Sequence, residues 1–432
     1  METLAFLAVV INVLIFSSAL ALNILFAEYA SYIRLILTLI LWAFTILIVF
    51  ERKALKSWEL HLPNQILFLL LSSFIVMLAV SAAVSPAPIV ATFYSGLTYL
   101  SFYPFTYLFL IIRKNPILTK RILLIFTILC VFLSLGVIYD ATVGLQNAPF
   151  VNSRIIAAID EFAIIDENGQ QRGGFFFGSS TVVYPFLSIG ILSIILLSKL
   201  FRYNKLNWLA ALSIPIIWLG CFFTFSRAPL ILCTVFSIYA FIELVVIDQN
   251  IKLSHKTILL LVFVILVGLF AEIRDFLYEQ AGSYQVTRFE STFSQGETGN
   301  YIRIMGWKEG LKLFDLLEAW RGYGLGTSNT RMGEIYDFPV RSHFESSIFL
   351  TFSEGGVFGL FARLLPLVVT FWLCQGTVVS RLFSVWMLLF FVNLCVSPLI
   401  DGHSVQLAYF LAMALCLAFA PLLKNNKFNE ID

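Results

Sequence analysis

The chain has 432 residues, of which 59 % are hydrophobic and only 12 % are charged. Apolar runs of about 18 residues or more recur along it, and each is long enough to cross a bilayer as a helix. This composition excludes a soluble globular domain, and the length of the runs excludes a β-barrel, whose spans are short and alternating. We therefore expect an all-α polytopic membrane protein with no nucleic-acid partner. The net charge of +2 says little, because the distribution of charge matters more.

The apolar runs predict about twelve transmembrane helices. Their ranges are roughly 4–26, 33–50, 66–84, 93–112, 121–139, 181–198, 206–223, 228–247, 257–271, 345–374, 380–397 and 405–423. The tenth is too long for one simple crossing and is expected to bend at Gly355 and Gly356. The chain then divides into spans one to nine (1–271, with a long outer loop at 140–180), a large polar loop (272–343), and spans ten to twelve with a short tail (344–432).

Lysine and arginine are concentrated in the short loops of one face, which predicts that this face is cytoplasmic. It carries five Arg and ten Lys, whereas the rest of the chain carries eleven Arg and two Lys. Both termini are then cytoplasmic, and both long loops lie outside. Arginine binds phosphate through two parallel hydrogen bonds, so the arginine-rich outer face indicates a phosphate ligand held at a few places. The alternative is that these arginines pair with acidic side chains and lipid headgroups.

A histidine and an arginine lie where the large loop returns to the membrane. Ser342 and Glu345 have the spacing of a capping box, which would place His343 in the first turn of a helix. Unpaired N–H groups and the helix dipole favour an anion there, and Arg341 lies one residue before the cap. Alternatively, Ser342 only begins a helix and His343 is an ordinary polar residue.

Two further arginines lie at comparable positions. Arg172 comes shortly before span six, and Arg227 lies in the short turn between spans seven and eight. Ser226 is expected to cap span eight, with Pro229 in its first turn, so Arg227 should lie close to the outer bilayer surface. A charged residue at such a depth is a functional candidate by default, unless its side chain only reaches out to the headgroups.

The large loop is expected to contain an amphipathic helix, residues 303–320, lying on the membrane surface with Trp307 and Trp320 at headgroup depth. A glycine-rich segment, residues 322–326, follows it and is either an ordinary loop or a place where backbone approaches a ligand. No spacing typical of a metal site stands out, so neither a metal nor a cofactor is expected. The substrate-binding candidates are Arg288, Arg303, Arg321, Gly324, Arg341 and Glu345, and His403 is a further candidate on the same face.

These motifs resemble those of the bacterial O-antigen polymerase and O-antigen ligase superfamily, over about residues 165–400. The resemblance rests on five features of the sequence. They are Arg-Gly-Gly-Phe-Phe at 172–176, Phe-Ser-Arg-Ala at 225–228, Gly-Tyr-Gly-Leu-Gly at 322–326 in a large penultimate outer loop, His343, and Glu-Gly-Gly-Val-Phe-Gly-Leu at 354–360.

The resemblance implies a glycosyltransferase that moves a glycan from an undecaprenyl-pyrophosphate carrier at the periplasmic face of the bacterial inner membrane. A polymerase adds the glycan to another repeat unit, with membrane lipid and a chain-length regulator protein as further partners. A ligase adds it to lipid A-core or to protein. The ligase pattern often has an asparagine after the motif histidine, whereas Phe344 follows His343 here, which favours the polymerase.

The mechanism implied by the resemblance is metal-independent inverting glycosyl transfer. Arg172 and Arg227, with Arg341, would stabilise the departing pyrophosphate. His343 would take the proton of the acceptor hydroxyl or bind phosphate, and Glu345 is either an alternative base or only the capping-box partner. A transporter or flippase is the competing class.

A transporter should show internal repeats and broken helices that place polar groups at mid-membrane. The sequence contains no repeat, and Arg363 and Glu243 are the charges nearest to span centres. The long outer loop also suits an enzyme better than a transporter.

Overall fold

The structure is a computed structural model in which every regular element among the described residues is a helix. Its elements are α1 (Glu2–Phe16), α3 (Ala30–Glu51), α6 (Ile89–Leu100), α7 (Pro104–Ile112), α8 (Pro116–Thr142), α10 (Val183–Phe201), α11 (Asn204–Phe222), α12 (Arg227–Phe241), η5 (Ile242–Ile247), α17 (Ser347–Leu373), α18 (Val378–Val396) and α19 (His403–Lys424). The residues described are 2–17, 30–51, 75, 79–101, 103–144, 147, 183–201, 204–224, 226–247, 305, 308, 320–327, 346–396 and 403–424. The predicted all-α class is confirmed for this part of the chain.

Several helices have the length and composition of membrane spans. Three of them are long and apolar enough to cross a bilayer: Pro116–Thr142, Val183–Phe201 and Ser347–Leu373. Shorter apolar helices accompany them at Glu2–Phe16, Tyr32–Leu47, Leu212–Phe222, Ala228–Leu244, Val379–Cys395 and Val405–Ala420. The predicted ninth span, residues 257–271, lies outside the described residues, so the count of twelve stays a prediction.

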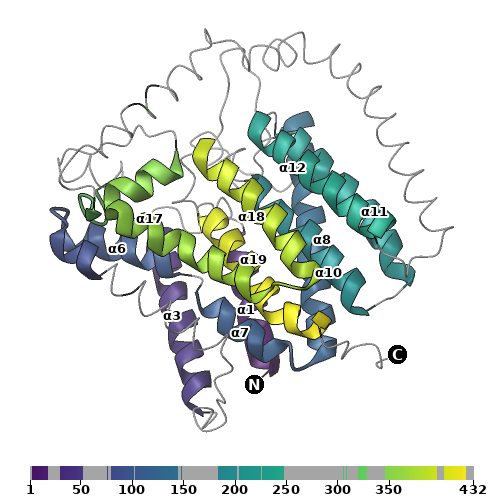
Figure 1. The fold of residues 1–432 in the computed structure, drawn as a ribbon, viewed down its shortest axis with the longest axis horizontal. Helices are drawn as coiled ribbons and strands as arrows, with labels where there is room; N and C mark the ends of the chain where they lie inside the picture. Colours follow the sequence, from purple (N-terminus) through teal and green to yellow (C-terminus); the bar gives the residue numbers. More distant parts are fainter. Residues whose placement is uncertain are drawn as a thin grey trace.

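Helix α10 lies at the centre of the bundle. It contacts α8, α11, α12, α18 and α19, and nearly all of its side chains are buried, including the serines Ser188 and Ser193. Its sequence is apolar on all sides, which is typical of a helix surrounded by others. Figure 1 shows α8, α10, α11 and α12 grouped on one side, with α6 and α17 on the other and α18 and α19 between them.

Small residues allow the central helices to approach closely. A Cβ added at Gly190 of α10 would lie 2.5 Å from the Cβ of Cys130 in α8. A Cβ added at Gly220 of α11 would lie 2.6 Å from the Cβ of Ser134, also in α8. Helix pairs in membranes associate through such small-residue contacts, because lipid removes the hydrophobic driving force between them.

Span four was predicted as a single helix over residues 93–112, and this prediction was wrong. The structure has two helices, α6 and α7, with a break between Leu100 and Pro104. Pro104 has no N–H to donate to the carbonyl of Leu100, and its ring would clash with that carbonyl in a continuous helix. Pro104 therefore begins α7 as its first residue, a position that proline favours.

The bend predicted in span ten is confirmed. Helix α17 contains one residue with non-helical dihedral angles, Gly356, at φ 61° and ψ −154°. A positive φ is strained for residues with a Cβ and accessible to glycine. The bend divides α17 into a short first part, which contains Glu354, and a longer second part, which contains Arg363.

A buried carboxylate joins three helix ends. Glu243 is fully buried in the π-helix η5, which continues α12. One of its oxygens lies 3.5 Å from Nζ of Lys199 in α10 and 3.4 Å from a guanidinium nitrogen of Arg381 in α18. Burial of a lone carboxylate is costly, so two cations at this place compensate its charge and tie the three helices together.

Candidate functional site

The glycine-rich segment, residues 322–326, packs against the first part of α17. The backbone N–H of Tyr323 donates to the carbonyl of Ser353 at 2.7 Å, and that of Gly324 donates to the carbonyl of Glu354 at 2.9 Å. Carbonyls in the middle of a helix normally accept from the N–H four residues later. The bend at Gly356 lies where those bonds would form, and the glycine-rich segment supplies donors there.

The Glu354 side chain connects this segment to α6. Its carboxylate is 3 % exposed and accepts a hydrogen bond from the N–H of Gly326 at 3.0 Å. The other oxygen accepts from the Tyr99 hydroxyl at 2.7 Å and from the Ser95 hydroxyl at 3.4 Å. A buried carboxylate is stable when donors surround it, and these donors come from two segments far apart in sequence.

Hydroxyls from residues 81–92 complete the attachment of the segment. Ser85 donates to the carbonyl of Leu325 at 2.7 Å, and Thr92 lies 3.4 Å from the same oxygen. Ser81 donates to the carbonyl of Glu354 at 3.1 Å. Residues 324–326 therefore contact three parts of the chain: α17, α6 and the residues that precede α6.

The glycines of the segment are required by protein packing. Gly324 has φ 102°, and a Cβ added there would lie 2.3 Å from the Cα of Ser85. A Cβ at Gly322 would lie 2.6 Å from the backbone nitrogen of Gly356. Packing against Ser85 thus explains why residue 324 is a glycine, and the substrate contact expected at Gly324 stays a prediction.

We expect Gly324→Ala to lower the free energy of unfolding. The strained backbone costs about 1–3 kcal/mol and the overlap with Ser85 about 1–3 kcal/mol more. A thermal melt of the detergent-solubilised chain measures the change. Gly355→Ala is the matched control, since a Cβ there has no atom within 4 Å. Equal melting temperatures of the two variants would contradict the packing role of Gly324.

A buried arginine lies beyond the bend of α17. Arg363 is 8 % exposed, and its Cζ lies 4.6 Å from the centre of the Tyr99 ring. Tyr99 thus contacts both charged residues of α17, Glu354 through its hydroxyl and Arg363 through its ring. Among the described residues, Nη1 of Arg363 has no hydrogen-bond partner. A charge buried among apolar helices is costly and marks a functional candidate.

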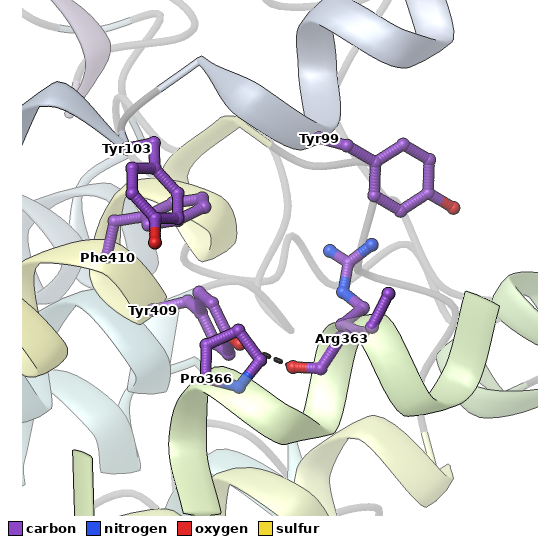
Figure 2. A pocket seen from close by; sticks show the side chains of 7 residues that line it. Tyr99, Tyr103, Arg363, Pro366, Tyr409 and Phe410 are labelled. Carbon is purple, nitrogen blue, oxygen red and sulfur yellow. Dashed lines mark hydrogen bonds between the residues drawn. The ribbon is translucent and has the colours of Figure 1, made fainter. Parts of the chain in front are cut away.

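A small pocket with an apolar lining surface lies beside Arg363. Figure 2 shows the guanidinium pointing away from α17 towards α6, with Tyr103 and Phe410 across the pocket. The Tyr409 hydroxyl donates to the backbone carbonyl of Arg363, which holds α19 against α17. The lining consists of Tyr99, Tyr103, Ala362, Arg363, Pro366, Tyr409 and Phe410.

Most of the predicted site residues lie outside the part of the chain that the structure describes. These are Arg172, Arg288, Arg303, Arg341, His343 and Glu345, together with the amphipathic helix at 303–320 except for three of its positions. One expectation about them is corrected. Helix α17 begins at Ser347 with Ser346 as its N-cap, so the first turn of this helix does not contain His343.

The remaining candidates lie at helix ends or on the surface. Arg227 is the first residue of α12 and Ser226 its N-cap, as predicted, and Pro229 falls in the first turn. Ser226 occupies the N-cap position, but its side chain makes no capping hydrogen bond. Arg321 is exposed beside the buried glycine segment, and His403 is the first residue of α19.

Two site residues were missed as site candidates although the sequence contains a signal for them. Glu354 belongs to the 354–360 motif, and Arg363 was recognised as a charge near a span centre. An acidic residue directly before two glycines inside an apolar run has few ways to be stabilised except by backbone donors at a break. Tyr99 carries no comparable signal, because tyrosine is common in apolar helices.

Protein-family models give no match to this chain, and curated proteins give no significant match. The fold and the site therefore define the class on their own. The part of the chain that the structure describes is all-helical, three of its helices are long and apolar enough to cross a membrane, and one bent helix carries a buried carboxylate and a buried guanidinium.

Proposed function

We propose that the chain polymerises undecaprenyl-pyrophosphate-linked oligosaccharide repeat units at the periplasmic face of the bacterial inner membrane. The products would be O-antigen, capsule or exopolysaccharide chains. The proposal includes twelve spans, cytoplasmic termini, and a chain-length regulator protein as a partner. The observation that carries it is the direct contact between two of the motifs that resemble the polymerase and ligase superfamily.

Those two motifs are separate in sequence and are joined in space. The N–H of Gly326, in the glycine-rich motif, donates to the carboxylate of Glu354, which begins the second motif, at 3.0 Å. The Gly324 N–H donates to the Glu354 carbonyl as well. A pair of motifs that builds one charged site inside apolar helices is better explained by a ligand than by membrane insertion alone.

In the proposed reaction the acceptor hydroxyl oxygen attacks the anomeric carbon of the donor sugar. The bond from that carbon to the pyrophosphate oxygen breaks, and the carrier pyrophosphate leaves with the electron pair. Arg172, Arg227 and Arg341 would stabilise the charge that develops on it. His343 would accept the acceptor proton, and inversion at the anomeric carbon follows from the single displacement.

Glu354 has a positioning role in this proposal. Its two oxygens already accept hydrogen bonds from Gly326, Tyr99 and Ser95, so the carboxylate orients the glycine segment and α6 relative to α17. Exposed Arg321 adjoins that segment and would contact the glycan or the carrier phosphates.

Two other functions remain as alternatives. A ligase would use the same donor chemistry and differ only in its acceptor, lipid A-core or protein. A transporter or flippase is favoured by one observation, the bend at Gly356 between Glu354 and Arg363, since broken helices with polar groups are common at transport sites.

The test is an electrophoretic profile of surface glycan from a strain that lacks the chain. Single repeats on lipid A-core would support the polymerase. Long chains accumulating on the lipid carrier, with none attached to lipid A-core, would establish the ligase instead. An unchanged glycan profile would refute both the polymerase and the ligase and would favour the transporter.

A further inference from the structure

A charged group lies at the end of the bundle where α10 and η5 end and α18 begins. Among the residues that the structure describes, Lys199 and Arg381 pair with the single carboxylate of Glu243, so positive charge exceeds negative charge in this group. The side chain of Glu243 is fully buried, that of Lys199 is 11 % exposed and that of Arg381 is 54 % exposed. The acid therefore lies beneath its partners, and a ligand that approaches from outside meets the guanidinium of Arg381 first.

Glu243 holds this guanidinium in place. One guanidinium nitrogen of Arg381 donates a hydrogen bond to a carboxylate oxygen of Glu243 at 3.4 Å. A guanidinium has five N–H donors, and more than half of this side chain is exposed, so further donors are accessible from outside. A long side chain that is already held loses less conformational entropy when it binds a ligand. Arg381 is therefore prepared to bind an anion, and a phosphate matches its planar fork.

The exposed surface that leads away from Arg381 is apolar. Leu388 and Val392 lie seven and eleven residues after Arg381, so the three residues share one face of α18, and they are 61 % and 41 % exposed. On α12 and its continuation η5, Ile238 and Ile242 are 44 % and 40 % exposed. Helices α12 and α18 contact each other. A hydrocarbon chain that lies along these faces would have its polar end at Arg381.

We propose that Arg381 binds the phosphate of an anionic phospholipid whose acyl chains lie along α12 and α18. Basic pockets between transmembrane helices bind the headgroups of such lipids, because charge and hydrocarbon are recognised together. The lipid bridges the two helices at the end where Glu243 also connects them. The site does not depend on the proposed glycan transfer, since none of the residues assigned to that reaction takes part in it.

The experiment is native mass spectrometry of the purified full-length chain in detergent, titrated with phosphatidylglycerol. Arg381→Gln should weaken the binding of one phosphatidylglycerol molecule by about tenfold or more, as expected for the loss of a charge-assisted hydrogen bond to phosphate. Diacylglycerol with the same acyl chains lacks the phosphate and should bind equally to wild type and variant. A thermal melt of each variant confirms that it is folded.

Arg121→Gln is the matched control. Arg121 is exposed in the first turns of α8. It lies at the same end of the bundle, because Nζ of the adjacent Lys120 is 5.8 Å from the centre of the ring of Phe201, the last residue of α10. The substitution removes the same charge from the same end and should leave the affinity for phosphatidylglycerol unchanged. Equal losses in the two variants would refute the site, since general attraction to positive charge would then explain the binding.

A second variant keeps the test decisive if Arg381→Gln does not fold. Glu243→Gln combined with Arg381→Gln removes one charge of each sign, so no buried carboxylate is left with fewer cations. This double variant should also bind phosphatidylglycerol more weakly, and wild-type affinity in either folded variant would overturn the site. Phosphatidylethanolamine that binds wild type as tightly would overturn the anionic assignment. Inorganic phosphate that displaces the lipid would overturn the lipid assignment in favour of a free phosphate.

Discussion

Glu354→Ala should release the glycine-rich segment from α17 and destabilise the protein. The substitution leaves the N–H of Gly326 and the hydroxyl of Tyr99 without their acceptor, and both lie in a buried environment. Each buried donor without a partner costs about 1–3 kcal/mol, so the expected loss for the two donors is about 2–6 kcal/mol. Glycan assembly should also fall, because the segment would no longer be held against α17.

Limited trypsin digestion measures this release directly. Arg321 is exposed and the residues that follow it are buried, so cleavage after Arg321 reports whether the segment is docked. We expect cleavage to be fastest in Glu354→Ala, intermediate in Tyr99→Phe, which removes one donor, and close to wild type in Ser95→Ala, whose bond is long at 3.4 Å. A Glu354→Ala protein that resists trypsin as well as wild type would show that other contacts hold the segment.

Arg227→Ala should abolish glycan assembly while leaving the protein in the membrane. Arg227 is the first residue of α12, where the helix N-terminus also favours an anion. Loss of one group that stabilises developing charge typically slows a reaction by about 10²–10³-fold, which would appear as loss of polymer on a glycan gel. Membrane fractionation checks insertion, and Arg121→Ala serves as the control. Normal polymer from Arg227→Ala would remove this residue from the site.

His343→Ala distinguishes the two roles considered for the histidine. If the imidazole takes the acceptor proton, the variant should lose polymer and still bind undecaprenyl pyrophosphate with wild-type affinity. If the imidazole contacts phosphate, binding should weaken along with activity. Binding by native mass spectrometry, read beside the glycan gel, separates these outcomes, and full activity would exclude both roles.

Fold class and the bend in α17 could be predicted because both depend on local properties of the chain. Apolar runs form helices in a bilayer since no other structure satisfies their backbone groups, and run length alone locates them. Gly355 and Gly356 in an overlong run predicted a bend, and Gly356 has the positive φ that only glycine adopts easily. The break before Pro104 is also a local property, because proline has no N–H to donate to the carbonyl of Leu100.

The charged site depended on contacts between distant segments, and no local pattern contains them. Glu354 and Tyr99 are 255 residues apart, and their hydrogen bond exists only because α6 lies beside α17. The same packing places Gly324 against Ser85 and Arg363 over the ring of Tyr99. The local sequence determines which hydrogen bonds and charges a side chain can offer. The packing of the helices determines which partner that side chain meets, because a buried polar group can bond only to the donors and acceptors beside it.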